Sequence, residues 1–226
     1  MTILTVAAHP DDEVLGCGGT MARLSAEHEV HVAILGEGTT SRTKDRADAD
    51  PAEVQHLQSN ARSAARLIGV ASVTFEGLPD NRFDQLALLD VVKRVERIID
   101  ELKPEAVFTH HPGDLNIDHQ VTARAVLTAT RPMAGSPVRD VYSFEIPSSS
   151  EWSFGQTGRS FLPNVFFDIT QTIDTKIAAM QCYLTEMRPY PHPRSAEALR
   201  AIAGKWGSTA GFRAAEAFEL VRSVRP

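Results

Sequence analysis

Short apolar segments alternate with longer segments of helical periodicity along most of this 226-residue chain. Four apolar, β-branched runs predict strands at 2–8, 29–35, 72–78 and 105–109. Four segments with helical spacing of apolar residues predict the intervening helices at 14–27, 53–68, 85–102 and 118–130. This order predicts an α/β fold with a mainly parallel sheet that helices cover on both faces.

The alternation is less regular after residue 131. Strands are expected at 140–146 and 165–169, and helices at 172–186, 196–205 and 214–221. The chain has no internal repeat and no clear linker, so residues 1–226 are interpreted as one domain in which 131–226 complete a core formed by 1–130. The long polar connection 36–51 is expected to be a mobile wall of a site.

The overall composition excludes several classes of protein. The formal net charge is −6 and the basic residues are dispersed, so we expect no nucleic-acid partner. The absence of leader features after Met1 and of a membrane-length apolar run predicts a soluble, cytoplasmic protein without a membrane span. Its composition is compatible with a homo-oligomer. Cys17 and Cys182 form no CxxC pair, so any metal site must use histidines and carboxylates.

The first predicted strand ends in the sequence His9-Pro10-Asp11-Asp12-Glu13. Adjacent carboxylates repel one another unless a cation compensates, and open α/β sheets bind ligands at the carboxyl ends of their strands. The spacing lets His9 and Asp12 converge on one metal ion while Asp11 faces the water that the ion polarises. The alternative is that these carboxylates only cap and charge the following helix.

The glycines of Gly16-Cys17-Gly18-Gly19 lie inside the helix that follows this motif. They lack the GxGxxG spacing of a dinucleotide site, and the acidic cluster before them would repel a pyrophosphate. We therefore interpret them as positions where the helix packs closely on the sheet.

A second polar cluster, His110-His111-Pro112-Gly113-Asp114-Leu115-Asn116-Ile117-Asp118-His119, follows the predicted strand 105–109. Because strand ends lie side by side in a doubly wound sheet, His119 can complete a His, Asp, His set with open positions for water and substrate. Asp118 can anchor a neighbouring histidine or order the loop. The alternative makes Asp118 an ordinary N-cap and the histidines solvated loop residues.

These two segments resemble the motifs of the PIG-L or LmbE-like deacetylases, which include N-acetylglucosaminyl-phosphatidylinositol de-N-acetylase. The resemblance covers essentially the whole chain and includes 36–42, 79–84 and 191–195. It implies a Rossmann-like three-layer sandwich and a zinc hydrolase that removes the N-acetyl group from an N-acetylglucosamine-type sugar. It also implies that His9, Asp12 and His119 are the metal ligands and Asp11 the general base. Iron(II) also suits two histidines and one carboxylate.

The chain departs from the family pattern at Asn116. Many members have His-Pro-Asp-His where this chain has Asn116-Ile117-Asp118-His119, so an amide replaces the histidine thought to stabilise the oxyanion. We assign catalytic roles to Asp11, Asn116 and Asp118. Because an amide supplies no proton, the proton for the leaving amine is left to Asp11 or to His110, His111 or His192.

Several polar residues have side chains that suit sugar hydroxyls or a phosphate. Those assigned to substrate binding are Arg42, Asn81, Arg82, His111, His192 and Arg194. No serine lies in a GxSxG elbow, so no acyl-enzyme is expected. Two alternatives stay open: an amidase that acts on another amide by the same mechanism, and a non-catalytic nucleotide-binding or regulatory module.

Overall fold

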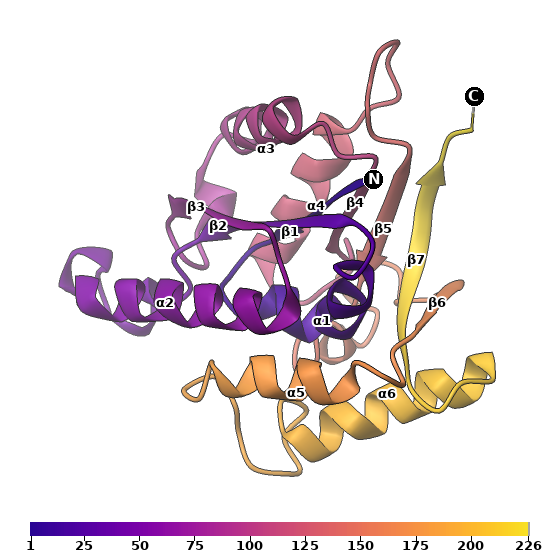
Figure 1. Ribbon diagram of the computed structural model, residues 1–226. Coiled ribbons are helices and arrows are strands. Elements are labelled where there is room, and N and C mark those ends of the chain that lie inside the picture. The colour runs from indigo at the N-terminus through magenta and orange to yellow at the C-terminus, as the bar shows by residue number, and fades with distance from the viewer. Residues whose placement is uncertain (226) are drawn as a thin grey trace.

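Residues 1–225, which the computed structural model describes, form a seven-stranded sheet with strand order β3-β2-β1-β4-β5-β7-β6 (Figure 1). The strands are β1 (Thr2–Ala7), β2 (Glu29–Gly36), β3 (Ser72–Leu78), β4 (Ala106–His110), β5 (Asp140–Phe144), β6 (Val165–Asp168) and β7 (Ala215–Ser223). Strands β1 to β5 pair in parallel, whereas β7 is antiparallel to both of its neighbours. The predicted mainly parallel α/β sheet is confirmed.

Helices cover both faces of this sheet (Figure 1). They are α1 (Asp12–Leu24), α2 (Pro51–Ile68), α3 (Leu88–Leu102), α4 (Ile117–Ala129), α5 (Ile173–Gln181) and α6 (Ala196–Ala210). The first, second, fifth and sixth lie on one face, and α3 and α4 lie on the other. No helix among the described residues is both long and apolar enough to cross a membrane.

Two large apolar clusters form most of the core, one on each face of the sheet, and Ile169, Ala203 and Ala214 form a third, smaller one. Along β1, Ile3 belongs to the first cluster and Leu4 to the second, because successive strand residues point to opposite faces. A strand covered on both faces needs apolar residues at every position. This explains why the central strands are continuous apolar runs rather than alternating ones.

Most predicted boundaries differ from the observed ones by a few residues. Helix α2 ends at Ile68 and is followed by Gly69, whose φ of 86° is the left-handed conformation of a glycine C-cap. The glycines of α1 pack closely as predicted, since a Cβ on Gly16 would lie 2.4 Å from the Phe144 ring. Helix α5 is shorter than expected and ends at Gln181, whereas α6 continues to Ala210.

The helix predicted at 214–221 is wrong, because 215–221 belong to β7. Alanine and glutamate favour a helix, but the preference amounts to only a few tenths of a kcal/mol per residue, roughly. Strand β7 lies between β5 and β6 and pairs with both, so its backbone groups are bonded on two sides. This position brings Glu216 and Glu219 into the protein interior, where they are 5% and 2% exposed.

Candidate active site

A cavity of about 200 Å³ lies at the carboxyl ends of the parallel strands. Its walls come from the loops that follow β1, β2, β3, β4 and β5 and from the segment between α5 and α6. The connection 36–51 supplies Gly38, Ser41 and Arg42 to this lining, and the rest is also almost entirely polar. The cavity is therefore built where an open α/β sheet binds ligands.

Three buried residues in this cavity bring possible metal ligands together. His9, Asp12 and His119 each offer one ligand atom, and these atoms all lie within 4.8 Å of one another. Oδ2 of Asp12 lies 3.4 Å from Nδ1 of His9 and 3.2 Å from Nε2 of His119. Two imidazoles and a carboxylate are a donor set that suits zinc or iron(II).

Carboxylates orient both histidine rings from the opposite side. Nε2 of His9 lies 3.0 Å from Asp118 and 3.1 Å from Asp80, and Nδ1 of His119 lies 3.1 Å from Asp114. A carboxylate on the second ring nitrogen fixes the orientation of a metal-binding histidine. Nδ1 of His9 and Nε2 of His119, the two nitrogens next to Asp12, thus remain available to bind an ion.

The electrostatics of the cluster favour positive charge between these three side chains. Burial lowers the pKa of His9 and His119, but nearby carboxylates outweigh it, so His9 has a pKa well above its usual value and His119 one of about 9. Burial raises the pKa of Asp12, but the imidazoles outweigh that effect and hold it well below its usual value. A metal ion would replace the bound protons, since histidine binds metals in its neutral form.

Asp118 is not the N-cap of α4, so that alternative is wrong. The cap is Asn116, whose Oδ1 accepts a hydrogen bond from the Asp118 amide at 2.8 Å. The Asp118 carboxylate instead accepts the backbone amides of Asn81 and Phe83, at 2.6 Å and 2.9 Å. It thereby joins the loop after β3 to the ring of His9.

Asp11 lies beside the proposed metal ligands in a rare backbone conformation, with a φ of 109°. Its amide donates to Oε2 of Glu13 at 3.0 Å, and Glu13 is held in turn by the Tyr183 hydroxyl. Strained backbone of this kind persists where the surroundings over-determine it, often at active sites. Burial raises the pKa of Asp11 to about 8, although Arg194, 2.7 Å from Oδ2, opposes the shift. A pKa close to neutrality suits a group that must both accept and release a proton.

Three of the six residues assigned to substrate binding line the cavity: Arg42, Asn81 and Arg194. Both arginines are already paired with carboxylates. Arg42 donates to the two oxygens of Glu186 at 2.7 Å and 2.8 Å, while Arg194 contacts Asp11. Both guanidinium groups therefore already have a carboxylate partner.

The other three assigned residues, Arg82, His111 and His192, are not among the lining residues. His111 is buried, with Nδ1 2.9 Å from Glu219 and Nε2 2.8 Å from the Arg159 carbonyl oxygen. His192 packs edge-on against Trp152. His111 is thus not a solvated loop residue.

His110 is buried behind the cavity and its ring stacks on His119. Its Nε2 accepts the Ala8 amide at 2.8 Å, and burial lowers its pKa to about 3. The ring is therefore neutral near pH 7 and carries no proton to donate from Nε2.

Several groups that shape the site have no role in the sequence motifs. Asp80 and Asp114 lie inside segments that carry the family resemblance, but neither was assigned a role, although each contacts a proposed ligand ring. Glu186 is the last residue of the predicted helix 172–186, a segment that carries no functional motif. Ser148 and Ser149 also line the cavity, after β5.

Comparisons with known proteins identify relatives over most of the chain. Residues 4–130 match the model of the PIG-L family, described as GlcNAc-PI de-N-acetylase. The chain is 29% identical over 185 residues to the uncharacterized deacetylase YaiS of Escherichia coli K12, covering 79% of this chain and 88% of that protein. It is 32% identical over 199 residues to 4-oxalmesaconate hydratase of Pseudomonas putida, covering 79% and 71%. The solved N,N'-diacetylchitobiose deacetylase of Pyrococcus horikoshii shares the fold, with a TM-score of 0.77, 22% identity and coverage of 98% and 84%.

Proposed function

This chain belongs to the PIG-L family, and from that membership we propose that it is a metal-dependent hydrolase that removes the acetyl group from an N-acetylglucosamine-type sugar conjugate. The observation that carries the proposal is the buried set of His9, Asp12 and His119, with Asp11 beside it in one polar cavity. A non-catalytic module would have no need of such a set, because buried groups of this kind are costly without a bound cation.

The three side chains are proposed to hold zinc, and iron(II) would suit the same donors. When bound, the ion would lower the pKa of a water molecule and polarise the amide carbonyl as a Lewis acid. The protein itself must then accept one proton during attack and return one to the departing amine.

Asp11 is the group that we assign to both proton transfers. It faces the cavity, and its contact with Arg194 at 2.7 Å fixes its orientation. The competing donors have other partners, since Nε2 of His110 accepts a backbone amide and both ring nitrogens of His111 are bonded. Asp11 therefore acts first as base and then as acid.

Asn116 is proposed to donate to the oxyanion that forms on the amide carbon. Asn116 lines the cavity; its Oδ1 caps α4 and its Nδ2 donates to Oδ1 of Asn81 at 3.0 Å. The side chain is thus oriented by its oxygen, and its amide nitrogen keeps a second N–H for another acceptor. The competing account is that Asn116 only braces the loop before α4.

The variant Asn116→Ala separates these two accounts. If the amide donates to the oxyanion, kcat should fall roughly ten- to a thousand-fold with little change in KM or metal content. Activity per bound metal is the deciding measurement. A ratio near that of the wild type, together with lower thermal stability and lower metal occupancy, would leave only the bracing role. Asn116→His should recover part of the activity if the position faces the reacting carbonyl.

A second candidate function is hydration of a carbon–carbon double bond, because one relative at 32% identity is named a hydratase with a carboxylate substrate. Charge in the cavity argues against a polyanionic substrate. The charged residues of the lining are four carboxylates and two guanidinium groups: Asp11, Asp12, Asp80, Glu186, Arg42 and Arg194. With all four carboxylates ionised, a divalent cation would bring their formal sum to about zero, and both arginines already have a carboxylate partner. A neutral acetamido sugar is therefore the better match.

The proposed function is tested by metal analysis followed by a substrate panel. We expect the purified protein to bind one zinc or iron(II) ion per chain and to release free amine from N-acetylglucosaminyl conjugates. Other N-acyl amides in the panel test the alternative amidase activity, and unsaturated carboxylates test hydration by loss of ultraviolet absorbance. A protein that bound no metal and gained no hydrolytic activity on zinc addition would favour the non-catalytic module.

A further inference from the structure

Helix α1, which begins directly after the proposed metal-binding motif, is broken at Cys17. The backbone of this residue, with φ −146° and ψ 23°, is not helical. In a regular α-helix the amide of Gly19 would donate to the carbonyl of Leu15, four residues earlier. These two groups lie on either side of the break, inside the protein, where backbone polar groups need partners.

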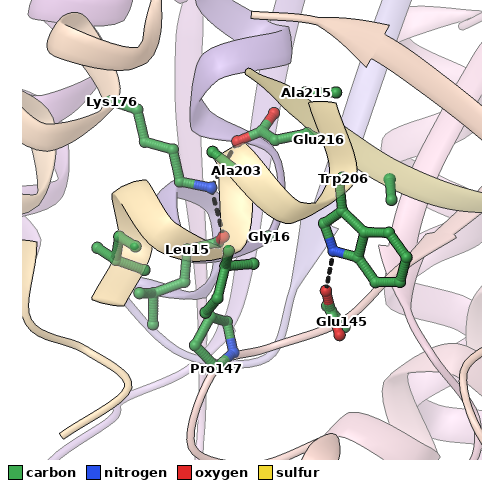
Figure 2. Close-up of a pocket in the computed structure, with 12 residues that line it drawn as sticks. Leu15, Gly16, Glu145, Pro147, Lys176, Ala203, Trp206, Ala215 and Glu216 are labelled. Carbon is green, nitrogen blue, oxygen red and sulfur yellow. Dashed lines mark hydrogen bonds and ion pairs between the residues drawn. The ribbon is translucent and has the colours of Figure 1, made fainter. Parts of the chain in front are cut away.

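A buried ion pair supplies both partners (Figure 2). Nζ of Lys176, on α5, donates to the Leu15 carbonyl at 2.8 Å. The carboxylate of Glu216, on β7, accepts from the amides of Gly19 and Thr20 at 3.0 Å and 2.6 Å. The ammonium and carboxylate groups are 2.5 Å apart. The pair is thus inserted into the helix, and side chains that enter the hydrogen-bond ladder are a recognised cause of kinks.

The break is held from several directions at once. The Thr172 hydroxyl donates to the Gly19 carbonyl at 2.8 Å. Gly16 packs closely against the Phe144 ring of β5, and a Cβ on Gly16 would lie 2.4 Å from that ring. This contact sets the distance between the first half of α1 and β5. The direction of that half is therefore determined by β5, α5 and β7, all distant from it in sequence.

Stability alone does not account for this arrangement. Lys176 and Glu216 are 6% and 5% exposed, and removing two charges from water costs about as much as their attraction returns, so apolar replacements are often neutral or stabilising. A continuous helix packed by apolar side chains would satisfy the same backbone groups without them. What the pair adds is one defined angle between the two halves of α1.

We propose that Lys176 and Glu216 are positioning residues for the metal centre. The first half of α1 carries Asp12, and its direction decides whether this carboxylate meets His9 and His119, which come from the end of β1 and from α4. By holding the helix broken, the ion pair directs the Asp12 carboxylate toward His9 and His119. This inference rests on the metal ligands of the proposed function.

Two double variants test the proposal without leaving an unpaired buried charge. Lys176→Met with Glu216→Gln keeps an oxygen acceptor for one of the amides of Gly19 and Thr20, whereas Lys176→Met with Glu216→Leu keeps none. Zinc affinity is measured by competition with a chelator, and site geometry by the visible absorption spectrum of the cobalt(II) form. We expect the leucine variant to bind zinc roughly 10- to 100-fold more weakly, the range seen when partners of metal ligands are lost, with a changed cobalt spectrum. The glutamine variant should weaken binding about three-fold or more, but less than the leucine variant.

Val95→Ala serves as the control for general destabilisation. Val95 is fully buried on α3, in the apolar cluster on the opposite face of the sheet. It should lower the thermal midpoint while leaving zinc affinity and the cobalt spectrum unchanged. A folded leucine variant with wild-type affinity and spectrum would overturn the proposal. If the leucine variant does not fold, the glutamine variant decides between the outcomes. Wild-type zinc affinity in the glutamine variant would overturn the proposal. A wild-type protein that binds neither zinc nor cobalt(II) would contradict the proposed function, and this inference with it.

Discussion

Replacing Asp12 with alanine is expected to abolish retention of the metal while the sheet stays folded. Asp12 is the carboxylate of the proposed ligand set, and its Oδ2 lies between the two histidine rings, 3.4 Å and 3.2 Å away. A full set of zinc ligands is worth roughly 10–16 kcal/mol, so one ligand contributes several kcal/mol and its loss should weaken binding by at least about 100-fold. His9→Ala and His119→Ala should behave in the same way. Elemental analysis of the purified variants measures the effect.

Asp100→Ala is the matched control for this substitution. Asp100 is exposed on α3, where it forms an ion pair with Lys103, and it does not line the cavity. Its variant should keep the wild-type metal content. If Asp12→Ala kept that content as well, Asp12 would no longer be a ligand, and the same reasoning applies to each histidine.

Asp11→Asn should keep the metal and the fold but lose most of the turnover. The amide has nearly the same shape, tolerates the positive φ of 109° better than most residues, and can still accept from Arg194. It cannot accept the proton of the attacking water, and a positioned base is worth roughly 10²–10⁴ in rate. The expected result is a fall in kcat of that size with metal content unchanged.

Turnover and metal content must be measured on the same preparation of this variant. Normal turnover at full metal occupancy would remove Asp11 as the base. A parallel loss of metal and activity would instead place Asp11 among the groups that hold the ion. The two results are distinguishable because the proposed ligands and the proposed base are different side chains, with Arg194 contacting only the latter.

Predictions from the sequence succeeded where the signal was local. Continuous apolar runs correspond to strands covered on both faces, and the spacing of His9 and Asp12 across a Pro-containing turn brings both into one cluster. His119 joins them because the ends of β1 and β4 are neighbours in the sheet, which the alternation of strands and helices predicts.

Predictions failed where partners distant in sequence override local preference. Residues 215–223 have helix-forming composition, yet pairing with β5 and β6 makes them a strand. Likewise, the sequence does not show that Arg42 pairs with Glu186 and Arg194 with Asp11. Neither pairing can be inferred from spacing, since the partners lie 144 and 183 residues away.

The sequence by itself therefore determined the parallel sheet and the three side chains proposed to bind metal, because hydrophobic periodicity and strand-end motifs are encoded over a few residues. Only the tertiary structure decided which carboxylates orient His9 and His119, and where α1 breaks between Leu15 and Gly19. The physical reason is that buried polar groups take whatever partner the packed chain brings within hydrogen-bond distance. Lys176 and Glu216 meet at the break in α1 because α5 and β7 pack there, a juxtaposition that no local pattern records.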